Sequence, residues 1–375
     1  MIAIESLPIT LLLALAVALV LCLAATPLVK WFAEKVGAID VPKDNRRMHS
    51  TPIPRLGGLA IFIGFVISVV IFADIGFATQ GILLGSVIIV IVGVVDDIVP
   101  LKPWQKFSAQ VVAALVAVLH GVVIDFISNP LPLEASPYLL HLGIFAIPIT
   151  ILWIVGITNA VNLIDGLDGL AVGVSTIASF TMLAVALFVA ADTNVAIILA
   201  ALAGACIGFL PYNLNPAKIF MGDTGALFLG FLLSALSIEG LFKFYAIISF
   251  AVPFMALALP IFDTTFAIFR RIAKGQSPMQ PDRGHLHHRL LDLGFSHKQV
   301  VFIIYLVSGA LGMLAVVITS SGPVRIVFTL LTFVVIVAAI LLIFNGSLHK
   351  RKKVLSEPKP EGEDKENQEA EHETN

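Results

Sequence analysis

Long runs of apolar residues alternate with short polar stretches along most of the chain. Apolar runs of roughly 17–25 residues are long enough to cross a bilayer as helices. The pattern therefore predicts about eleven membrane-spanning helices, one for each run. The predicted helices begin near Leu7, Leu56, Ile75, Phe107, Leu142, Gly169, Thr193, Thr224, Phe244, Gln299 and Ile326. The fold class that follows is an all-α polytopic membrane protein.

The composition agrees with this fold class and adds little about partners. Of the 375 residues, 58% are hydrophobic and 13% are charged, and the mean hydropathy is +0.99. The formal net charge of −2 indicates no particular partner, and nucleic acid is not expected among the partners. Cys22 and Cys206 both fall inside apolar runs, so buried thiols are expected rather than a disulfide framework.

The two ends of the chain differ in character. The first apolar run, residues 7–29, is longer than the apolar core of a signal peptide, so we expect a retained first helix. After His349 the chain turns polar and charged without apolar periodicity, which is typical of disorder. The predicted organisation is a transmembrane domain at residues 1–348 and a disordered charged tail at residues 349–375.

Lysine and arginine residues gather in the loops on one side of the predicted helices. They are Lys35, Lys43, Arg46, Arg47, Arg55, Lys102, Lys106, Arg270, Arg271, Lys274, Arg283, Arg289, Lys350, Arg351, Lys352 and Lys353. The opposite side holds Lys243 and Arg325. Because basic loops stay in the cytoplasm, we expect the N-terminus outside and the C-terminus in the cytoplasm.

This orientation places the polar motifs on the cytoplasmic face. They are DD at 96–97, NAVNLIDGLDGL at 159–170, PYNLNPAKIFMGDTG at 211–225 and PDRGHLHHRLLDLG at 281–294. A transporter more often carries its charged groups near the midplane, around broken helices. Chemistry gathered at the inner interface favours an enzyme that joins a soluble cytosolic substrate to a lipid, and a transporter or flippase is the less favoured alternative.

The motif at 159–170 combines two amides with two carboxylates between apolar runs. Its polar residues are Asn159, Asn162, Asp165 and Asp168. Carboxylates at a membrane are costly and usually functional, and carboxylate and amide oxygens suit Mg²⁺. The glycines in the motif predict a break in the helix. The alternative is a loop with helix caps, since Asn, Asp and Gly favour helix ends.

Two further motifs carry carboxylates. Asp96 and Asp97 end the third predicted helix, and adjacent like charges suit a proton acceptor. Lys106 follows and is placed to hold phosphate, although a polar helix end explains the pair equally well. Asp223 opens the eighth helix, either as a cap or as a metal ligand, and Asn213 lies in the polar turn before it.

The last motif is basic. Arg283, His285, His287, His288 and Arg289 lie close together in sequence. Zinc is disfavoured because no cysteine lies nearby and the helical spacing of zinc histidines is absent. Arginines suit a diphosphate, with the histidines donating hydrogen bonds, and a solvated loop is the alternative.

Asp263 is an ionisable residue inside a predicted helix, seven residues before Arg270. We expect it either to pair with a neighbouring helix or to contact substrate.

In combination these motifs resemble the polyprenyl-phosphate N-acetylhexosamine-1-phosphate transferases. The resemblance covers about residues 7–345 and includes RRMHSTPIPRLGGLAI at 46–61. It implies that undecaprenyl phosphate attacks the β-phosphorus of UDP-N-acetylglucosamine (UDP-GlcNAc), giving undecaprenyl-diphospho-GlcNAc and UMP. This is the first membrane step of a cell-wall polymer such as teichoic acid. Leu286 interrupts the histidines, which is unlike the branch that uses UDP-MurNAc-pentapeptide; that branch is the alternative.

The resemblance also implies roles for individual residues. Asp223 and Asn162 match the Mg²⁺ ligands, with Mn²⁺ as the alternative ion. The catalytic carboxylates are Asp96, Asp97, Asp165 and Asp168. The substrate-binding residues are Asn159, Lys106, Asn213, Arg283, His285, His287, His288 and Arg289. We further expect direct attack without a covalent intermediate, a homodimer, and a location in the bacterial cell membrane with the active site facing the cytoplasm.

Overall fold

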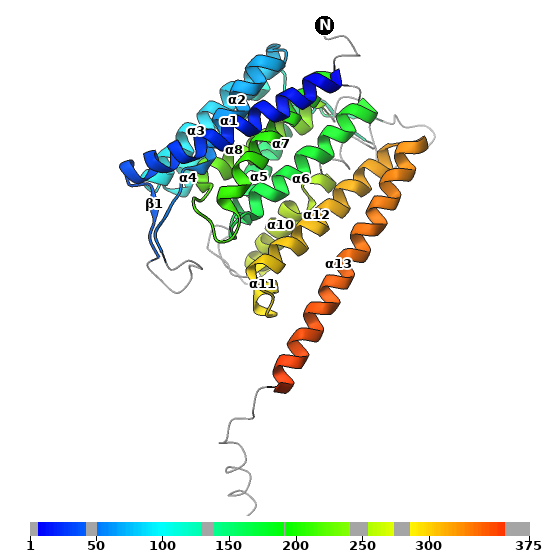
Figure 1. The fold of residues 1–375 in the computed structure, drawn as a ribbon. Coiled ribbons are helices and arrows are strands. Elements are labelled where there is room, and N and C mark those ends of the chain that lie inside the picture. Colours follow the sequence, from blue (N-terminus) through cyan, green and yellow to red (C-terminus); the bar gives the residue numbers. More distant parts are fainter. Residues whose placement is uncertain are drawn as a thin grey trace, which may run out of the picture.

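The computed structural model is a bundle of long helices that run side by side (Figure 1). It describes residues 7–42, 51–128, 139–190, 192–240, 254–273 and 286–356. The helices are α1 (Leu7–Val36), α2 (Gly57–Phe72), α3 (Phe77–Ile98), α4 (Pro103–Leu119), α5 (Ala146–Ile164), α6 (Leu170–Val185), α7 (Thr193–Asn213), α8 (Gly222–Gly240), α10 (Ala258–Ala273), α11 (Leu286–Asp292), α12 (His297–Thr319) and α13 (Gly322–Ser356). A 3₁₀ turn, η2 (Gly143–Phe145), precedes α5, and a π turn, η3 (Ala186–Ala190), follows α6.

Two short antiparallel hairpins complete the described structure. β1 (Ile39–Asp40) pairs with β2 (Ile53–Pro54), so the loop between α1 and α2 folds back on itself. β3 (Phe126–Ser128) pairs with β4 (Leu139–His141) between α4 and α5.

The helices confirm the expected membrane fold. Seven helices of the described chain are long and apolar enough to cross a bilayer, namely α1, α3, α5 with η2, α6 with η3, α7, α8 and α12. Shorter apolar helices lie at Gly57–Phe72 and Gly322–Ala338. α4 and α10 lie in the fourth and ninth predicted spans, but the predicted start near Phe244 lies outside the described residues.

At the C-terminal end, α13 continues to Ser356, past the predicted domain boundary at residue 348. Residues 357–375 lie outside the described chain, so the division into a domain and a tail stays a prediction.

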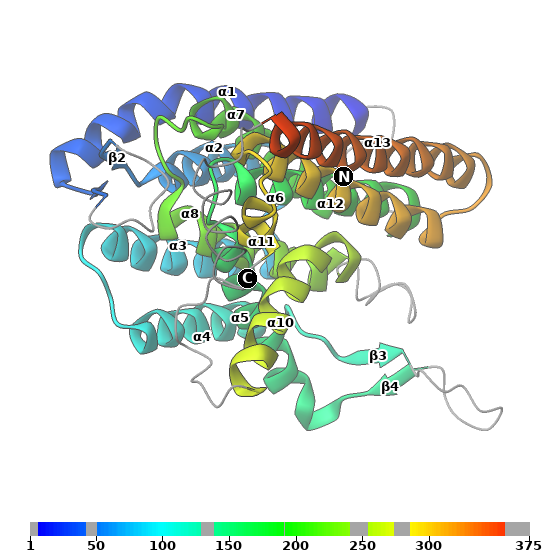
Figure 2. The same cartoon turned by 90° about the horizontal axis from the view of Figure 1, so that it is seen from below.

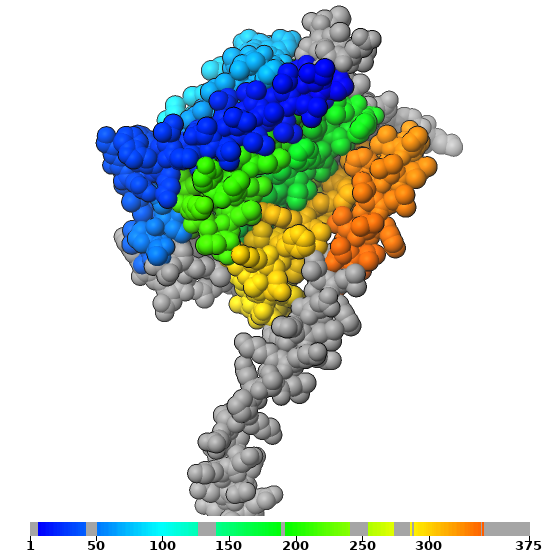
Figure 3. All heavy atoms as spheres, in the orientation of Figure 1, coloured from blue at the N-terminus to red at the C-terminus, as the bar shows by residue number. Residues whose placement is uncertain are grey.

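α8 lies at the centre of the bundle. It packs against α3 and α5, and more lightly against α2, and all of its residues from 224 to 238 are buried. Figure 2 shows α1 and α4 on opposite sides, with α2, α3 and α8 between them. α1 lies along one outer face in the space-filling view (Figure 3) and exposes much of its apolar surface, as a lipid-facing helix does.

Glycines allow the backbones around α8 to approach closely. A Cβ at Gly58 would lie 2.0 Å from the backbone nitrogen of Gly225, and one at Gly93 would lie 2.4 Å from the Cα of Thr224. Small residues of this kind are the usual means of packing helices inside a membrane, where apolar surface alone gives little attraction between helices. α2 and α3 therefore hold the first turn of α8 from two sides.

The loop before α2 is joined to the loop before α8. The N–H groups of Gly57 and Gly58 donate to the carbonyls of Phe220 and Met221 at 2.9 and 2.8 Å, and Phe220 N–H donates to Pro54 O at 2.8 Å. The start of α8 is thus fixed by main-chain hydrogen bonds as well as by helix packing.

Replacing Gly58 by Ala is expected to lower the thermal unfolding midpoint of the purified protein. The added methyl group meets backbone atoms that cannot move aside, and overpacking of this kind costs about 1–3 kcal/mol in the free energy of unfolding. Gly309→Ala in α12 is the matched control, since a Cβ there meets nothing within 4 Å. Equal midpoints for both variants would show that the close approach of α2 and α8 is not needed for stability.

Candidate functional site

Asp97, near the end of α3, caps the start of α8. Its carboxylate accepts hydrogen bonds from the backbone N–H groups of Asp223 and Thr224 at 3.1 and 3.0 Å, and from Thr224 Oγ1 at 2.6 Å. The side chain is 2% exposed. The first N–H groups of a helix have no partner within the helix and attract negative charge. A buried carboxylate on another helix therefore satisfies them here.

Arg55, just before α2, compensates part of this buried charge. Its Nε donates to the carbonyl oxygen of Asp97 at 3.1 Å and lies 3.9 Å from Asp97 Oδ1.

Lys106 on α4 joins two of the predicted carboxylates. Its Nζ lies 3.2 Å from Asp96 Oδ2 and 2.6 Å from Asp223 Oδ2. The other oxygen of Asp96 accepts from Leu101 N–H at 2.7 Å, and Asp223 Oδ1 accepts from Asn162 Nδ2 at 3.3 Å. A cation and two carboxylates from three helices thus meet at one end of the bundle.

Asp165 ends α5 beside this group. The helix stops at Ile164 and the next one begins at Leu170, so the predicted break between them is confirmed. Burial raises the pKa of Asp165 to about 8, and the negative charges of Asp223, Asp97 and Asp168 add to the shift. The acid form is favoured because no cation of the described chain pairs with this carboxyl.

Asp168 faces the loop between α7 and α8. Its Oδ2 accepts from Asn215 Nδ2 at 2.9 Å and from Ala217 N–H at 3.0 Å. Asn213 makes a second link, because its Oδ1 accepts from Gly169 N–H at 3.1 Å while its Nδ2 donates to Ile219 O at 3.1 Å. The loop that carries the two aspartates is therefore tied to the loop that leads into α8.

Asn159 is engaged inside the protein. Its Nδ2 donates to Gln110 Oε1 at 2.6 Å and to Val155 O at 2.8 Å, and Gln110 Nε2 returns a bond at 3.4 Å. Gln110 is 2% exposed. The amides of Asn159 and Asn213 thus serve internal contacts in this structure, and their predicted contact with substrate stays a prediction.

The basic motif lies partly outside the described chain. Arg283 and His285 fall there, and His287 and His288 are described only as positions on α11. Arg289 lies on the same helix and is exposed. The start of α11 is held by Asp263, whose Oδ1 accepts from Leu286 N–H at 2.8 Å. Asp263 thus links α10 to the next helix, which agrees with the structural alternative given for it.

Several side chains that contact the site were not among the predicted site residues, including those of Arg55, Gln110, Asn215 and Thr224. Gln110 is a lone polar residue in an apolar run, and a buried polar side chain in such a run is informative. Thr224 follows Asp223 in the first turn of a predicted helix, where a hydroxyl can accept or donate. Arg55 stands two residues before a helix that begins with two glycines. These signals mark candidates without naming their partners.

The site fits a magnesium ion by its donor chemistry. Within the described residues, no group of three or more His, Cys, Asp and Glu side chains is arranged to hold a metal. Mg²⁺, however, commonly takes one or two protein carboxylates and completes its shell with water and substrate phosphates. Asp223, with 28% of its side chain exposed, and the adjacent amide of Asn162 provide such a partial set.

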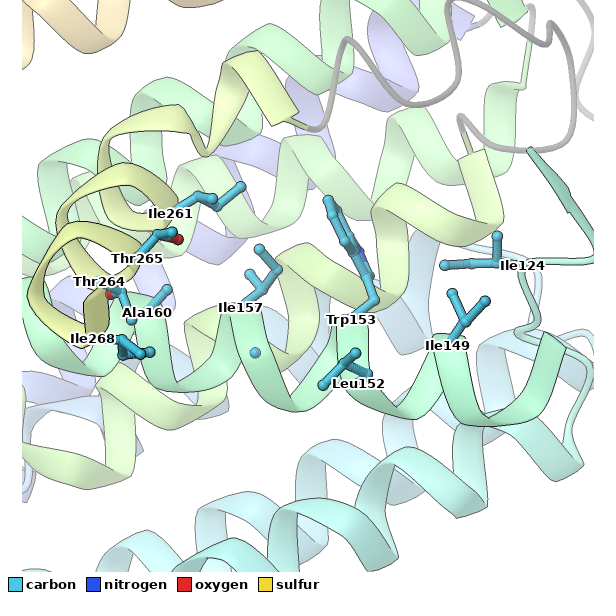
Figure 4. Close-up of a pocket in the computed structure, with 11 residues that line it drawn as sticks. Ile124, Ile149, Leu152, Trp153, Ile157, Ala160, Ile261, Thr264, Thr265 and Ile268 are labelled. Atoms are coloured by element: carbon cyan, nitrogen blue, oxygen red, sulfur yellow. The ribbon is translucent and has the colours of Figure 1, made fainter. Parts of the chain in front are cut away.

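An apolar groove runs between α5 and α10 (Figure 4). It has a volume of about 310 Å³. Among its lining residues are Ile149, Leu152, Trp153, Ile157, Ile261 and Ile268. The lining on α5 also includes Gly156 and Ala160, and the latter stands next to Asn159 and two residues before Asn162. One helix therefore carries both the groove and part of the polar site.

Comparison with known proteins identifies the family. The sequence profile of Glycosyl transferase family 4 matches residues 79–241, which hold Asp96, Asp97 and all the site residues from Lys106 to Asp223. A probable undecaprenyl-phosphate N-acetylglucosaminyl 1-phosphate transferase of Bacillus subtilis is 44% identical over 334 residues, covering 88% of this chain and 91% of that protein. The chain belongs to glycosyl transferase family 4.

Two further relatives share less identity with this chain than the Bacillus subtilis protein does. A decaprenyl-phosphate N-acetylglucosaminephosphotransferase of Mycobacterium tuberculosis is 37% identical over 309 residues, which is 75% of this chain and 76% of that protein. A phospho-N-acetylmuramoyl-pentapeptide-transferase of Staphylococcus aureus is 33% identical over 286 residues, with coverages of 71% and 86%. The family resemblance expected from the motifs is confirmed.

Asp165 gives a test of the site's electrostatics in the metal-free protein. Its pKa is about 8 when folded and its ordinary value is 3.8, so between these values the folded chain holds a proton that the unfolded chain has released. Stability therefore falls as pH rises through this window. Asp165→Asn removes the effect, and we expect its unfolding midpoint in EDTA to fall less than that of the wild type between about pH 6 and about pH 8.

Asp74→Asn is the control, because Asp74 is an exposed carboxylate remote from the site. The difference between wild type and Asp165→Asn amounts to at most about 1.4 kcal/mol per pH unit. Parallel pH curves for Asp165→Asn and the wild type would contradict a protonated Asp165.

Proposed function

We propose that this protein transfers GlcNAc-1-phosphate from UDP-GlcNAc to undecaprenyl phosphate and releases UMP. The observation that carries the proposal is the meeting of Asp96, Asp223 and Lys106 at the end of the bundle. It joins acid–base groups to a phosphate-binding cation beside a helix that also lines an apolar groove. The Bacillus subtilis relative, similar over nearly the whole chain, is named a probable undecaprenyl-phosphate N-acetylglucosaminyl 1-phosphate transferase, which supports the lipid acceptor and the group transferred.

The chemistry is an exchange at the β-phosphorus of the nucleotide sugar. An oxygen of undecaprenyl phosphate forms a bond to that phosphorus, and the bond from the phosphorus to the bridging oxygen breaks. UMP leaves with that oxygen, and the sugar phosphate stays on the lipid. Phosphoryl transfer of this kind depends mainly on positioning and on stabilisation of charge.

Asp96 is the better placed of the paired carboxylates to take a proton from the lipid phosphate. Both oxygens of Asp97 are occupied by donors at the start of α8. Asp96 is held by one backbone N–H and by Lys106, which is 26% exposed and therefore reachable. A lipid phosphate that binds Lys106 comes within reach of the Asp96 carboxylate. Asp97 then serves to hold the first turn of α8 in place.

Asp223 and Asn162 would hold Mg²⁺, which when bound neutralises charge on the diphosphate. Asp165 lies on the loop after α5, close enough to Asp223 for their charges to interact, and Asp168 follows on the same loop. Because burial raises the pKa of Asp165 in the metal-free protein, this carboxyl repels an approaching phosphate less than an ordinary aspartate would. The basic residues near α11 bind the sugar and diphosphate from the cytoplasmic side, as their sequence predicts.

The apolar groove between α5 and α10 takes the first isoprene units of the carrier lipid. Its lining is almost entirely aliphatic and aromatic, and isoprenoid chains present only apolar surface. The groove and the polar site share α5, so a lipid lying in the groove carries its phosphate toward Asn162 and Lys106.

Release of UMP by purified protein in detergent tests the reaction. We expect release with undecaprenyl phosphate, Mg²⁺ and UDP-GlcNAc, and its loss in EDTA. Asp223→Asn is expected to lower kcat by at least about 100-fold, and Mg²⁺ is expected to raise the unfolding midpoint of the wild type but not of this variant. Asp74→Asn serves as the control carboxylate.

The outcomes separate the alternatives. Release of UMP only with UDP-MurNAc-pentapeptide would support the proposed phosphoryl transfer but contradict UDP-GlcNAc as the substrate. Wild-type turnover in Asp223→Asn would contradict the assignment of Asp223 as a Mg²⁺ ligand. No release with either nucleotide from folded protein would contradict the proposed function.

Filling the groove tests the lipid site. Gly156→Leu places a side chain into open space in the groove lining, and we expect the KM for undecaprenyl phosphate to rise by about 10-fold while the KM for UDP-GlcNAc changes little. Gly309→Leu is the matched control, since its position also faces open space but lies on α12, away from the groove. An equal effect of both variants, or none from the first, would place the lipid elsewhere.

A further inference from the structure

Tyr305, in the middle of α12, contacts the loop that carries Asp165 and Asp168. Its hydroxyl donates a hydrogen bond to the carbonyl oxygen of Gly169. Its ring lies against α6, where a Cβ at Gly173 would be 2.0 Å from the ring carbon that bears the hydroxyl. Gly169, which caps α6, and Gly173, in its first turn, carry no side chains, and Tyr305 fills the space that this leaves.

Gly169 joins the aspartate-bearing loop to α6. It directly follows Asp168, has a φ of +79° and caps the start of α6. Its N–H donates to Asn213 Oδ1 at 3.1 Å, while its carbonyl accepts both from Gly173 N–H at 2.9 Å and from Tyr305. Gly169 is therefore held through its N–H by the last residue of α7 and through its carbonyl by α12.

Packing alone does not hold this loop on its α12 side. A cavity of about 320 Å³ lies there, lined by Asp168, Asn215, His297, Lys298 and Tyr305 among others. The loop therefore has few packing partners where this pocket opens, and dispersion forces hold it only weakly there. The hydrogen bond from Tyr305 lies at the edge of the pocket and supplements the hydrogen bonds that Asn213 and Asn215 make to the loop.

We infer that Tyr305 is a positioning residue, which holds the 165–169 loop so that the carboxyl groups of Asp165 and Asp168 keep the geometry needed for transfer. The residue does not touch the reacting atoms. It acts through the Gly169 carbonyl, and it connects the aspartate loop to α12, the helix that follows the histidine-bearing α11. The consequence for catalysis rests on the proposed function; the restraint on the loop does not.

Tyr305→Phe tests the inference, because it keeps the ring against Gly173 and removes only the hydroxyl. We expect kcat to fall by about 10-fold, since small misplacements of catalytic groups cost one to two orders of magnitude, while the KM for UDP-GlcNAc stays within about two-fold. Hydrogen exchange of peptides covering residues 165–170 is expected to speed up by at least about three-fold.

Tyr212→Phe is the matched control. Its hydroxyl also donates to a main-chain carbonyl, Leu23 O on α1, at 3.2 Å, and it does not contact the loop. We expect unchanged kcat and unchanged exchange at residues 165–170. Faster exchange in both variants, or in neither, would overturn the restraint whether or not the protein turns over. Faster exchange with normal kcat would overturn the catalytic role.

A double variant separates loop positioning from general weakening. Asn215→Ala removes the opposite anchor, on Asp168. If both anchors hold one loop, the second loss costs less than the first, so the double variant loses less in kcat than the product of the single losses. A loss equal to that product would mean that Tyr305 acts independently of the loop, which would overturn the inference. Absence of turnover in the wild type would refute the proposed function, while the exchange measurement would still decide the restraint.

Discussion

The hydrogen bonds from the start of α8 to Asp97 are the constraint on which the site depends. Three donors from two residues converge on one buried carboxylate. These hydrogen bonds link helices α3 and α8, which are far apart in sequence. An uncompensated carboxylate inside a protein is very costly, and so are orphan N–H groups. The Asp97 carboxylate and the first N–H groups of α8 therefore stabilise each other. Their hydrogen bonds fix where α8 begins, and so fix the position of Asp223.

Lys106 compensates the charge of two further carboxylates nearer the surface. Placed between Asp96 and Asp223, it lowers the repulsion between these two carboxylates. Lys106 and Asp223 are also the side chains to which we assign phosphate and metal in the proposed function, so these ligands would compete with the ion pairs of Lys106.

The sequence predicted the helices and the break after Asp165 well, because both follow from local patterns. Apolar runs mark spans such as α3 and α7, and the glycines after Asp165 mark the break between α5 and α6. What sequence could not predict is pairing at a distance. Asn159 was expected to bind substrate, yet its amide meets Gln110, 49 residues away. Asn213 similarly supports Gly169. A local sequence pattern does not distinguish an amide that binds a ligand from one that hydrogen-bonds to a distant part of the same chain.

The burial of α8 has a consequence for how the protein is made. This helix has a mean hydropathy of 1.2, against 2.1 to 2.8 for the other six spanning helices of the described chain, and it is also the most enclosed of them. Alone in lipid it would be a poor insertion signal. Its packing partners α2, α3 and α5 precede it in the chain, so they have already left the ribosome when it emerges. Order of synthesis thereby provides a protein surface to receive the helix that carries Asp223.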